Sequence, residues 1–148
     1  MVKKLFIYIF IYTLLVGCNT QNTLINNECE SEFEYMNIGA SELGMDENGY
    51  YHIEWLESYN QTFATLEAIT NTEGYNKIYW TSRQGIEYGG EFVSCVNPAS
   101  YTSGGVARQT MAVWEEMVGD TITIYAGFTD WCDIQYLDSI GVIVEDEI

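Results

Sequence analysis

Basic residues and histidine are scarce in this sequence of 148 residues. Five Lys and Arg face 22 Asp and Glu, which gives a formal net charge of −17 at pH 7, and His52 is the only histidine. This negative field repels phosphate backbones, so nucleic acid is not expected as a partner. It equally opposes adsorption to anionic lipid, which requires basic clusters. A single histidine and the lack of any C-x-x-C pair also argue against a zinc site.

The motifs of common hydrolases are missing as well. There is no G-x-S-x-G and no nucleophile with an evident base, so we predict no catalytic residues. Carboxylates alone are abundant enough to leave an enzymatic alternative, because a glycosidase needs only two of them, roughly 5–10 Å apart. The acids considered for that role are Glu54, Glu57, Glu115, Glu116, Asp130 and Asp133.

Only one long apolar run occurs, from Leu5 to Val16, and it follows Lys3 and Lys4 and precedes Gly17. This order is typical of a secretory signal peptide. The run is shorter than the ~20 residues of a membrane-spanning helix, and polar residues soon follow it. We therefore expect cleavage in preference to a membrane span.

The stretch LVGC, residues 15–18, resembles the lipobox of bacterial lipoproteins. In that family the signal is cut before the cysteine, which then carries a diacylglycerol and usually an N-acyl chain such as palmitate. The resemblance implies removal of residues 1–17 and lipidation of Cys18, and two or more acyl chains give stable attachment to a membrane. Asn19 stands where family members retained in the inner membrane carry Asp, which implies the outer membrane, on either its periplasmic side or its surface. A plain secretory signal with an incidental cysteine is the alternative.

The mature chain divides into a tether and one domain. Residues 18–30 are rich in Asn, Thr and Gln, which predicts a flexible polar tether. Residues 31–148 suffice for one domain with a sizeable core. Without the two lysines of the signal, three basic residues stand against 22 acidic ones, a net charge of −19.

Alternating apolar and polar residues recur along the domain and predict strands. The expected strands are 51–56, 63–70, 75–82, 91–96, 106–114, 121–128 and 136–144. With one proline in the chain, Gly, Asn, Asp and Ser must make the turns between them. The pattern favours an all-β antiparallel sandwich of about seven strands over strand–helix–strand units. Residues 36–49 are expected to form an initial strand and a long loop.

The strand order over residues 50–145 resembles the immunoglobulin-like domains of bacterial envelope proteins. Trp80 lies in the third strand, where such folds often bury a tryptophan. GDTITIYAG (119–127) resembles the sixth strand, and LDSIGVIVE (137–145) resembles the last. The disulfide between the second and sixth strands of antibody domains cannot form, because these strands contain no cysteine here. The resemblance implies a binding or structural module.

Three cysteines follow Cys18, namely Cys29, Cys95 and Cys132. Export to an oxidising compartment allows one bridge among them and leaves one thiol. We predict a Cys95–Cys132 disulfide, since both residues lie at ends of core strands and Cys29 lies near the flexible start. Three reduced thiols are the alternative.

Trp131 lies in the polar loop TDWCD, between Asp130 and Asp133. A loop tryptophan is hard to explain by core packing, and aromatic faces bind sugars and protein partners. We predict that these three residues bind a glycan or an envelope protein. The rival explanations are a Trp131 that caps the sandwich and a merely solvated acidic loop. Calcium held by the two aspartates is a further alternative; no other metal and no cofactor is expected.

Thr121 and Ser139 each follow an aspartate and precede an isoleucine. This motif resembles the acceptor of general O-glycosylation in some Gram-negative bacteria. The alternative is that Asp120 and Asp138 bond local backbone amides at turns.

The sequence therefore predicts a non-enzymatic, lipid-anchored envelope protein with an immunoglobulin-like module for a glycan or a protein. A calcium-stabilised adhesion-type domain and a small carboxylate-dependent glycan hydrolase are the alternatives.

Overall fold

The computed structural model describes residues 29–147, so Cys18 and the predicted signal peptide lie outside the described part. Residues 29–147 form eleven strands and one short 3-10 turn. The strands are β1 (Met36–Gly39), β2 (Gly44–Met45), β3 (Tyr50–Trp55), β4 (Thr62–Thr70), β5 (Lys77–Ser82), β6 (Gly85–Tyr88), β7 (Glu91–Ser94), β8 (Ala99–Ser103), β9 (Val106–Val113), β10 (Thr121–Thr129) and β11 (Gln135–Asp146), and the turn is η1 (Glu115–Met117). No helix within residues 29–147 has the length and apolar character needed to cross a membrane.

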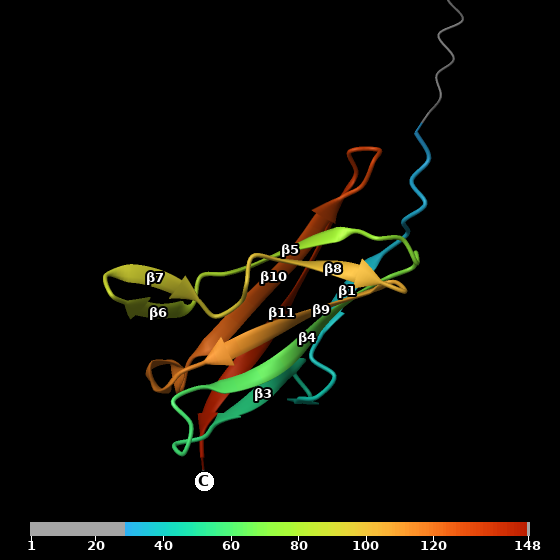
Figure 1. The fold of residues 1–148 in the computed structure, drawn as a ribbon. Helices are drawn as coiled ribbons and strands as arrows, with labels where there is room; N and C mark the ends of the chain where they lie inside the picture. Colours follow the sequence, from blue (N-terminus) through green and yellow to red (C-terminus); the bar gives the residue numbers. More distant parts are fainter. Residues whose placement is uncertain (1–28, 148) are drawn as a thin grey trace, which may run out of the picture.

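Nine of these strands make one hydrogen-bonded sheet in the order β1-β4-β9-β8-β5-β10-β11-β3-β2. The sheet doubles back at β8, whose first residues pair with β5 and whose last two, Thr102 and Ser103, pair with β9. The layer of β1, β4 and β9 thus lies over that of β5, β10, β11 and β3, with one core between them (Figure 1). The predicted all-β, immunoglobulin-like sandwich is confirmed.

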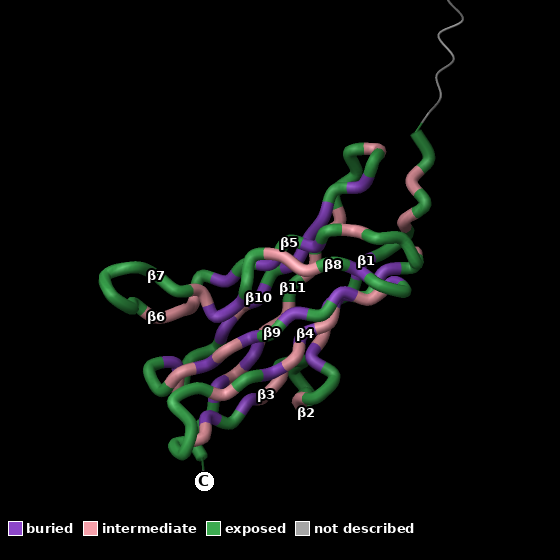
Figure 2. Tube along the Cα trace, viewed as in Figure 1, coloured by how far each residue is buried: buried purple, intermediate pink, exposed green. Residues whose placement is uncertain are grey.

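Strand alternation fills this core, and the bands of buried residues along the strands are visible in Figure 2. The buried side chains in β4 and β10 are those of Ala64, Leu66, Ala68, Thr70, Ile122, Ile124, Ala126 and Phe128. Because successive side chains on a strand point to opposite faces, each set turns towards the opposite layer. Trp80, expected to be buried, is 3% exposed and donates a 2.8 Å hydrogen bond from Nε1 to Oγ of Ser100.

One strand pair departs from the antiparallel prediction. β3 runs parallel to β11, from Tyr50 opposite Gly141 to Trp55 opposite Asp146. β3 and β11 therefore end at the same end of the sandwich, which becomes important for the site described below.

The strand count also exceeds the predicted seven. β6 and β7 pair only with each other and project from the body as a hairpin (Figure 1). Residues 91–96, predicted as one strand, contribute β7 to this hairpin. β8 was not predicted at all, since it directly follows Pro98 and its only buried residue is Thr102.

The predicted Cys95–Cys132 disulfide is wrong. The structure joins Cys132 to Cys29, with Cα atoms 5.5 Å apart and a sequence separation of 103 residues. Cys95 is free and buried. Its backbone is fixed in the core, because its N–H donates to the carbonyl of Gln84 at 3.2 Å and its carbonyl accepts from Ala112 at 2.8 Å. Cys132, by contrast, lies in the loop that joins β10 to β11, where it is bonded to Cys29.

Aromatic packing and hydrogen bonds hold residues 31–33 beside this loop. The ring of Phe33 lies edge-on to Phe128, with centroids 4.7 Å apart. The hydroxyl of Tyr136 donates to the carbonyl of Phe33 at 2.8 Å and lies 2.8 Å from Oγ of Ser31. Cys29, assigned above to a flexible tether, is therefore attached to the sandwich.

Burial also determines the chemistry of the free thiol. Desolvation raises the pKa of Cys95 and outweighs the opposing contact with the Ser82 hydroxyl. Since the thiolate is the reactive form of cysteine, Cys95 behaves as a small apolar core residue.

Candidate functional site

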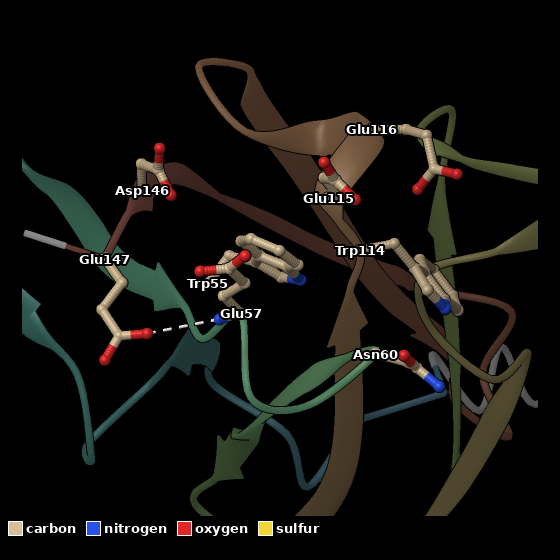
Figure 3. Close-up of a pocket in the computed structure, with 8 residues that line it drawn as sticks. All are labelled: Trp55, Glu57, Asn60, Trp114, Glu115, Glu116, Asp146 and Glu147. Atoms are coloured by element: carbon tan, nitrogen blue, oxygen red, sulfur yellow. Dashed lines mark hydrogen bonds between the residues drawn. The ribbon is translucent and has the colours of Figure 1, made fainter.

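Five carboxylates and two tryptophans line an open groove of about 910 Å³ at one end of the sandwich. The lining residues are Trp55, Glu57, Asn60, Trp114, Glu115, Glu116, Asp146 and Glu147 (Figure 3). β3, β9 and β11 all end at this groove, and acids occupy the end of each strand or the residues after it. We call this feature the acidic groove; it is built by three chain segments that are far apart in sequence.

Trp55 closes β3 and is 8% exposed. Its indole Nε1 is buried and has no hydrogen-bond partner among residues 29–147. In Figure 3 the nitrogen edge of this ring faces the side of the groove where Trp114 stands. A buried indole N–H normally finds an acceptor, and leaving it unpaired costs about 1–3 kcal/mol. Trp80, whose Nε1 is bonded to Ser100, has no such deficit.

Trp114 continues β9 with extended backbone, at φ −122° and ψ 166°, and is half-buried. The turn η1 follows, and its Met117 side chain is 2% exposed. Because Met117 is anchored in the core, the two preceding residues, Glu115 and Glu116, are left exposed at the rim.

The acidic groove contains no positive side chain. None of its five carboxylates forms an ion pair with any residue in the described part of the chain. One hydrogen bond crosses the rim, from the backbone N–H of Glu57 to Oε2 of Glu147 at 3.3 Å (Figure 3). Arg108 instead pairs with Glu67, at 3.0 Å. The groove therefore concentrates negative potential beside two aromatic rings.

Such an arrangement suits an organic cation. Ammonium and guanidinium groups are attracted both to carboxylates and to the faces of tryptophan rings. Across residues 29–147, no three His, Cys, Asp or Glu side chains come close enough together to hold a metal ion. All five groove carboxylates are exposed to solvent, whereas a carboxyl that acts as a general acid is usually desolvated.

The predicted site around Trp131 lies at the other end of β11, in the loop between β10 and β11. Trp131 is 67% exposed, so it does not cap the sandwich. Asp133 is exposed and has a φ of 60°, a left-handed turn conformation. Asp130, however, is buried. Only two of the three predicted ligand residues thus face solvent.

Asp130 shapes the loop. Its Oδ1 accepts the backbone N–H groups of Cys132 at 2.9 Å and Ile134 at 2.8 Å. Burial would raise the pKa of Asp130, but the Ser31 hydroxyl and these two amides together hold the pKa below its ordinary value. Oδ1 is therefore occupied by the protein's own donors, whereas the buried Oδ2 has no hydrogen-bond partner within residues 29–147.

The two predicted glycosylation residues, Thr121 and Ser139, are both exposed, on adjacent strands β10 and β11. Of the turn role proposed as an alternative, Asp138 shows only the local bond, since its Oδ1 accepts the N–H of Ser139 at 2.8 Å inside β11 and not at a turn. Its Oδ2 accepts the N–H of Ile38 at 2.7 Å and so also ties β1 to β11. Glycosylation of Thr121 and Ser139 stays a prediction.

The single histidine lies on β3 between two carboxylates. Nδ1 of His52 is 2.8 Å from Oε1 of Glu145, and Nε2 is 3.3 Å from Oδ2 of Asp46. The hydrogen bonds to Glu145 and then to Asp46 raise the pKa of His52. His52 thus links the turn before β3 to the end of β11.

A pH dependence of stability follows from His52. Its folded-state pKa lies above its unfolded value of about 6.5, so the imidazolium stabilises the folded chain fully below that pH. This contribution is lost as the pH rises through the folded-state pKa. Urea unfolding between about pH 6 and pH 8.5 should show the wild type losing stability relative to His52→Gln; two parallel curves would contradict the prediction.

From the sequence we considered three acids of the acidic groove, but we did not predict that they lie together in one site. Glu57, Glu115 and Glu116 were among the acids considered above, and the structure brings these three together while Asp130 and Asp133 lie elsewhere. The two tryptophans were missed as site residues. Each is followed within two positions by a glutamate, and this repeated pairing was the available signal.

No protein-family model matches this sequence, and no curated protein matches it. Among solved structures, the chain is similar to the ASH/PapD-like domain of human CEP192 (PapD-like domain 7). The two share 9% sequence identity with a TM-score of 0.49, and the alignment covers 86% of this chain and 96% of that one.

Proposed function

We propose that this protein is a lipid-anchored, non-enzymatic protein of the cell envelope that binds a positively charged partner in its acidic groove. The observation that carries the proposal is five exposed carboxylates beside two tryptophans, with no basic residue among them. Opposite charge steers association and favours the correct partner, and indole faces add cation–π attraction. The partner is a basic envelope protein or another amine-bearing molecule.

The location rests on the chain's start and on its disulfide. The lipobox-like residues 15–18 and Asn19 support anchoring through Cys18 in the outer membrane. A Cys29–Cys132 bridge suits an oxidising compartment outside the cytoplasm. Mass spectrometry of the native host's envelope fraction should find a mature chain that starts at lipidated Cys18, and a chain that retains residues 1–17 would contradict the anchor.

We prefer binding of a positively charged partner over glycoside hydrolysis and over calcium binding as the function of this domain. Glycoside hydrolysis needs one carboxyl held protonated, usually by burial, beside a second, and the groove acids are exposed. For calcium, the predicted aspartate pair offers only the exposed Asp133 and the buried Oδ2 of Asp130, because Oδ1 of Asp130 accepts two backbone amides.

Neutralising the groove tests the binding proposal. The full-length protein, purified with its lipid in nonionic detergent, is titrated calorimetrically with acetyl-tetra-arginine amide and with spermine. The triple variant Glu57→Gln, Glu115→Gln and Glu116→Gln should bind both probes at least about tenfold more weakly, since three attractive charges at the site are lost.

Net charge alone is controlled by a second triple variant. Glu73→Gln, Glu87→Gln and Glu91→Gln remove the same charge from exposed positions outside the groove. This variant should stay within about threefold of the wild type, because exposed charges at a distance are screened by salt. Equal losses in the two triple variants, or a wild type that binds neither probe, would refute the acidic groove as the site.

A further inference from the structure

We infer that the partner presents an extended basic peptide segment. An Arg or Lys side chain lies among the carboxylates and against Trp114, while a main-chain carbonyl accepts the hydrogen bond of Trp55 Nε1. This inference rests on the proposed function and names the chemistry of the partner in the same groove.

The hydrogen-bonding inventory of the groove selects a peptide. Its five carboxylates can only accept hydrogen bonds, and the indole N–H of Trp55 can only donate one. A polyamine offers donors alone and leaves Trp55 unpaired, whereas a neutral sugar offers acceptors without positive charge. A basic peptide supplies cationic donors for the rim and carbonyl acceptors for Trp55 together.

The unpaired indole nitrogen of Trp55 is the observation that distinguishes the groove from a mere surface cluster of acids. Its ring is 8% exposed, yet Nε1 has no partner in the described chain, and its nitrogen edge turns towards Trp114 across the groove (Figure 3). Buried polar groups are nearly always paired in native proteins, so an orphaned donor beside a cavity indicates an acceptor that arrives with a ligand. Asn60 and Glu57, which line the groove with Trp55, are exposed, so their side chains can change rotamer without disturbing the core.

The size of the groove fits several residues of such a segment. At about 910 Å³ it lies near the upper end of the 300–1,000 Å³ typical of binding pockets. One arginine or lysine side chain would leave most of this volume empty. The groove is also open to solvent and lies at strand ends, so a partner segment can reach it from outside.

Trp55→Phe tests the inference, because phenylalanine keeps an aromatic ring and lacks the donor. The full-length protein in nonionic detergent is titrated with acetyl-tetra-arginine amide and with spermine, which carries the same number of charges but no carbonyl. Trp55→Phe should weaken peptide binding about five- to tenfold and change spermine binding by less than twofold, since only the peptide accepts from Nε1. The wild type should also prefer the peptide.

Trp80→Phe is the matched control. It removes an indole N–H that is already bonded to Ser100, so it should lower the melting temperature more than Trp55→Phe and leave peptide binding unchanged. A Trp55→Phe variant that melts like the wild type and binds the peptide equally well would overturn the inference, and so would equal losses for peptide and spermine. In both cases binding itself would persist and the proposed function would stand. If the wild type bound neither probe, both the peptide inference and the proposed function would be refuted.

Discussion

Removing the Cys29–Cys132 bridge is expected to lower the free energy of unfolding by about 3–5 kcal/mol. The bridge closes a sequence separation of 103 residues, and a cross-link over a loop of about this length restricts the unfolded chain strongly. Because domains are stable by only about 5–15 kcal/mol, this is a large share of the total. Urea unfolding of the Cys29→Ser, Cys132→Ser double variant beside the wild type measures the loss.

Cys95→Ala distinguishes this bridge from the Cys95–Cys132 pairing that the sequence suggested. In the Cys95→Ala variant, dithiothreitol should still reduce stability as much as it does in the wild type. The double serine variant should be insensitive to the reductant. If Cys95→Ala abolished the effect of the reductant, the observed pairing would be wrong.

Leu66→Ala is expected to lower the free energy of unfolding by about 3–5 kcal/mol. Leu66 lies in the middle of β4, has no exposed surface and belongs to the core between the two layers. Truncation removes buried methyl groups and leaves a cavity that neighbouring strands cannot close fully. Urea unfolding with an unchanged m-value would show that the loss arises in a fold that is otherwise intact.

Leu137→Ala makes the same chemical change at a site that is 77% exposed, on the outer face of β11. Surface substitutions of this kind usually stay within about 0.5 kcal/mol of the wild type. Similar losses from both leucine variants would place Leu66 outside the core and contradict the packing of the sandwich.

The strands that sequence predicted best are those whose two faces meet different surroundings. β4 and β10 each turn an apolar set to the core and a more exposed set outward, so their period-two pattern is clear. In β9 the core set includes the buried Gln109, which makes the pattern ambiguous. β8 and the β6–β7 hairpin lack that contrast, because β8 crosses between layers and the hairpin packs on neither. Their places depend on pairing with distant strands, which local pattern does not encode.

The disulfide could not be chosen from strand ends. Cys95 was predicted to lie at the end of a core strand, but β7 ends at Ser94 and belongs to the projecting hairpin, and Cys95 itself is buried in the core. Cys29 precedes every strand, and it reaches Cys132 only because Phe33 packs on Phe128. That aromatic contact is a tertiary event between residues nearly a hundred positions apart.

For the acidic groove too, the sequence shows the residues but not their convergence. Acids at 57, 115–116 and 146–147 are plain in the sequence, and so are Trp55 and Trp114. Their convergence depends on β3 running parallel to β11, a pairing that the antiparallel prediction did not contain. The unpaired state of Trp55 Nε1 is likewise a property of packing alone.

The Cys29–Cys132 bridge also decides how the domain bears mechanical load. A pull on the chain ahead of Cys29 passes across the bridge to the loop between β10 and β11. From Cys132 the pull follows the backbone of β11, which its hydrogen bonds to β10 and β3 hold in the sheet, and it bypasses the strands between Cys29 and Cys132. Once the bridge is reduced, the same pull reaches β1, whose four pairs with β4 can open one after another. The redox state of two sulfur atoms thus sets whether tension bypasses strands β1 to β10 or acts on β1 at the edge of the sheet.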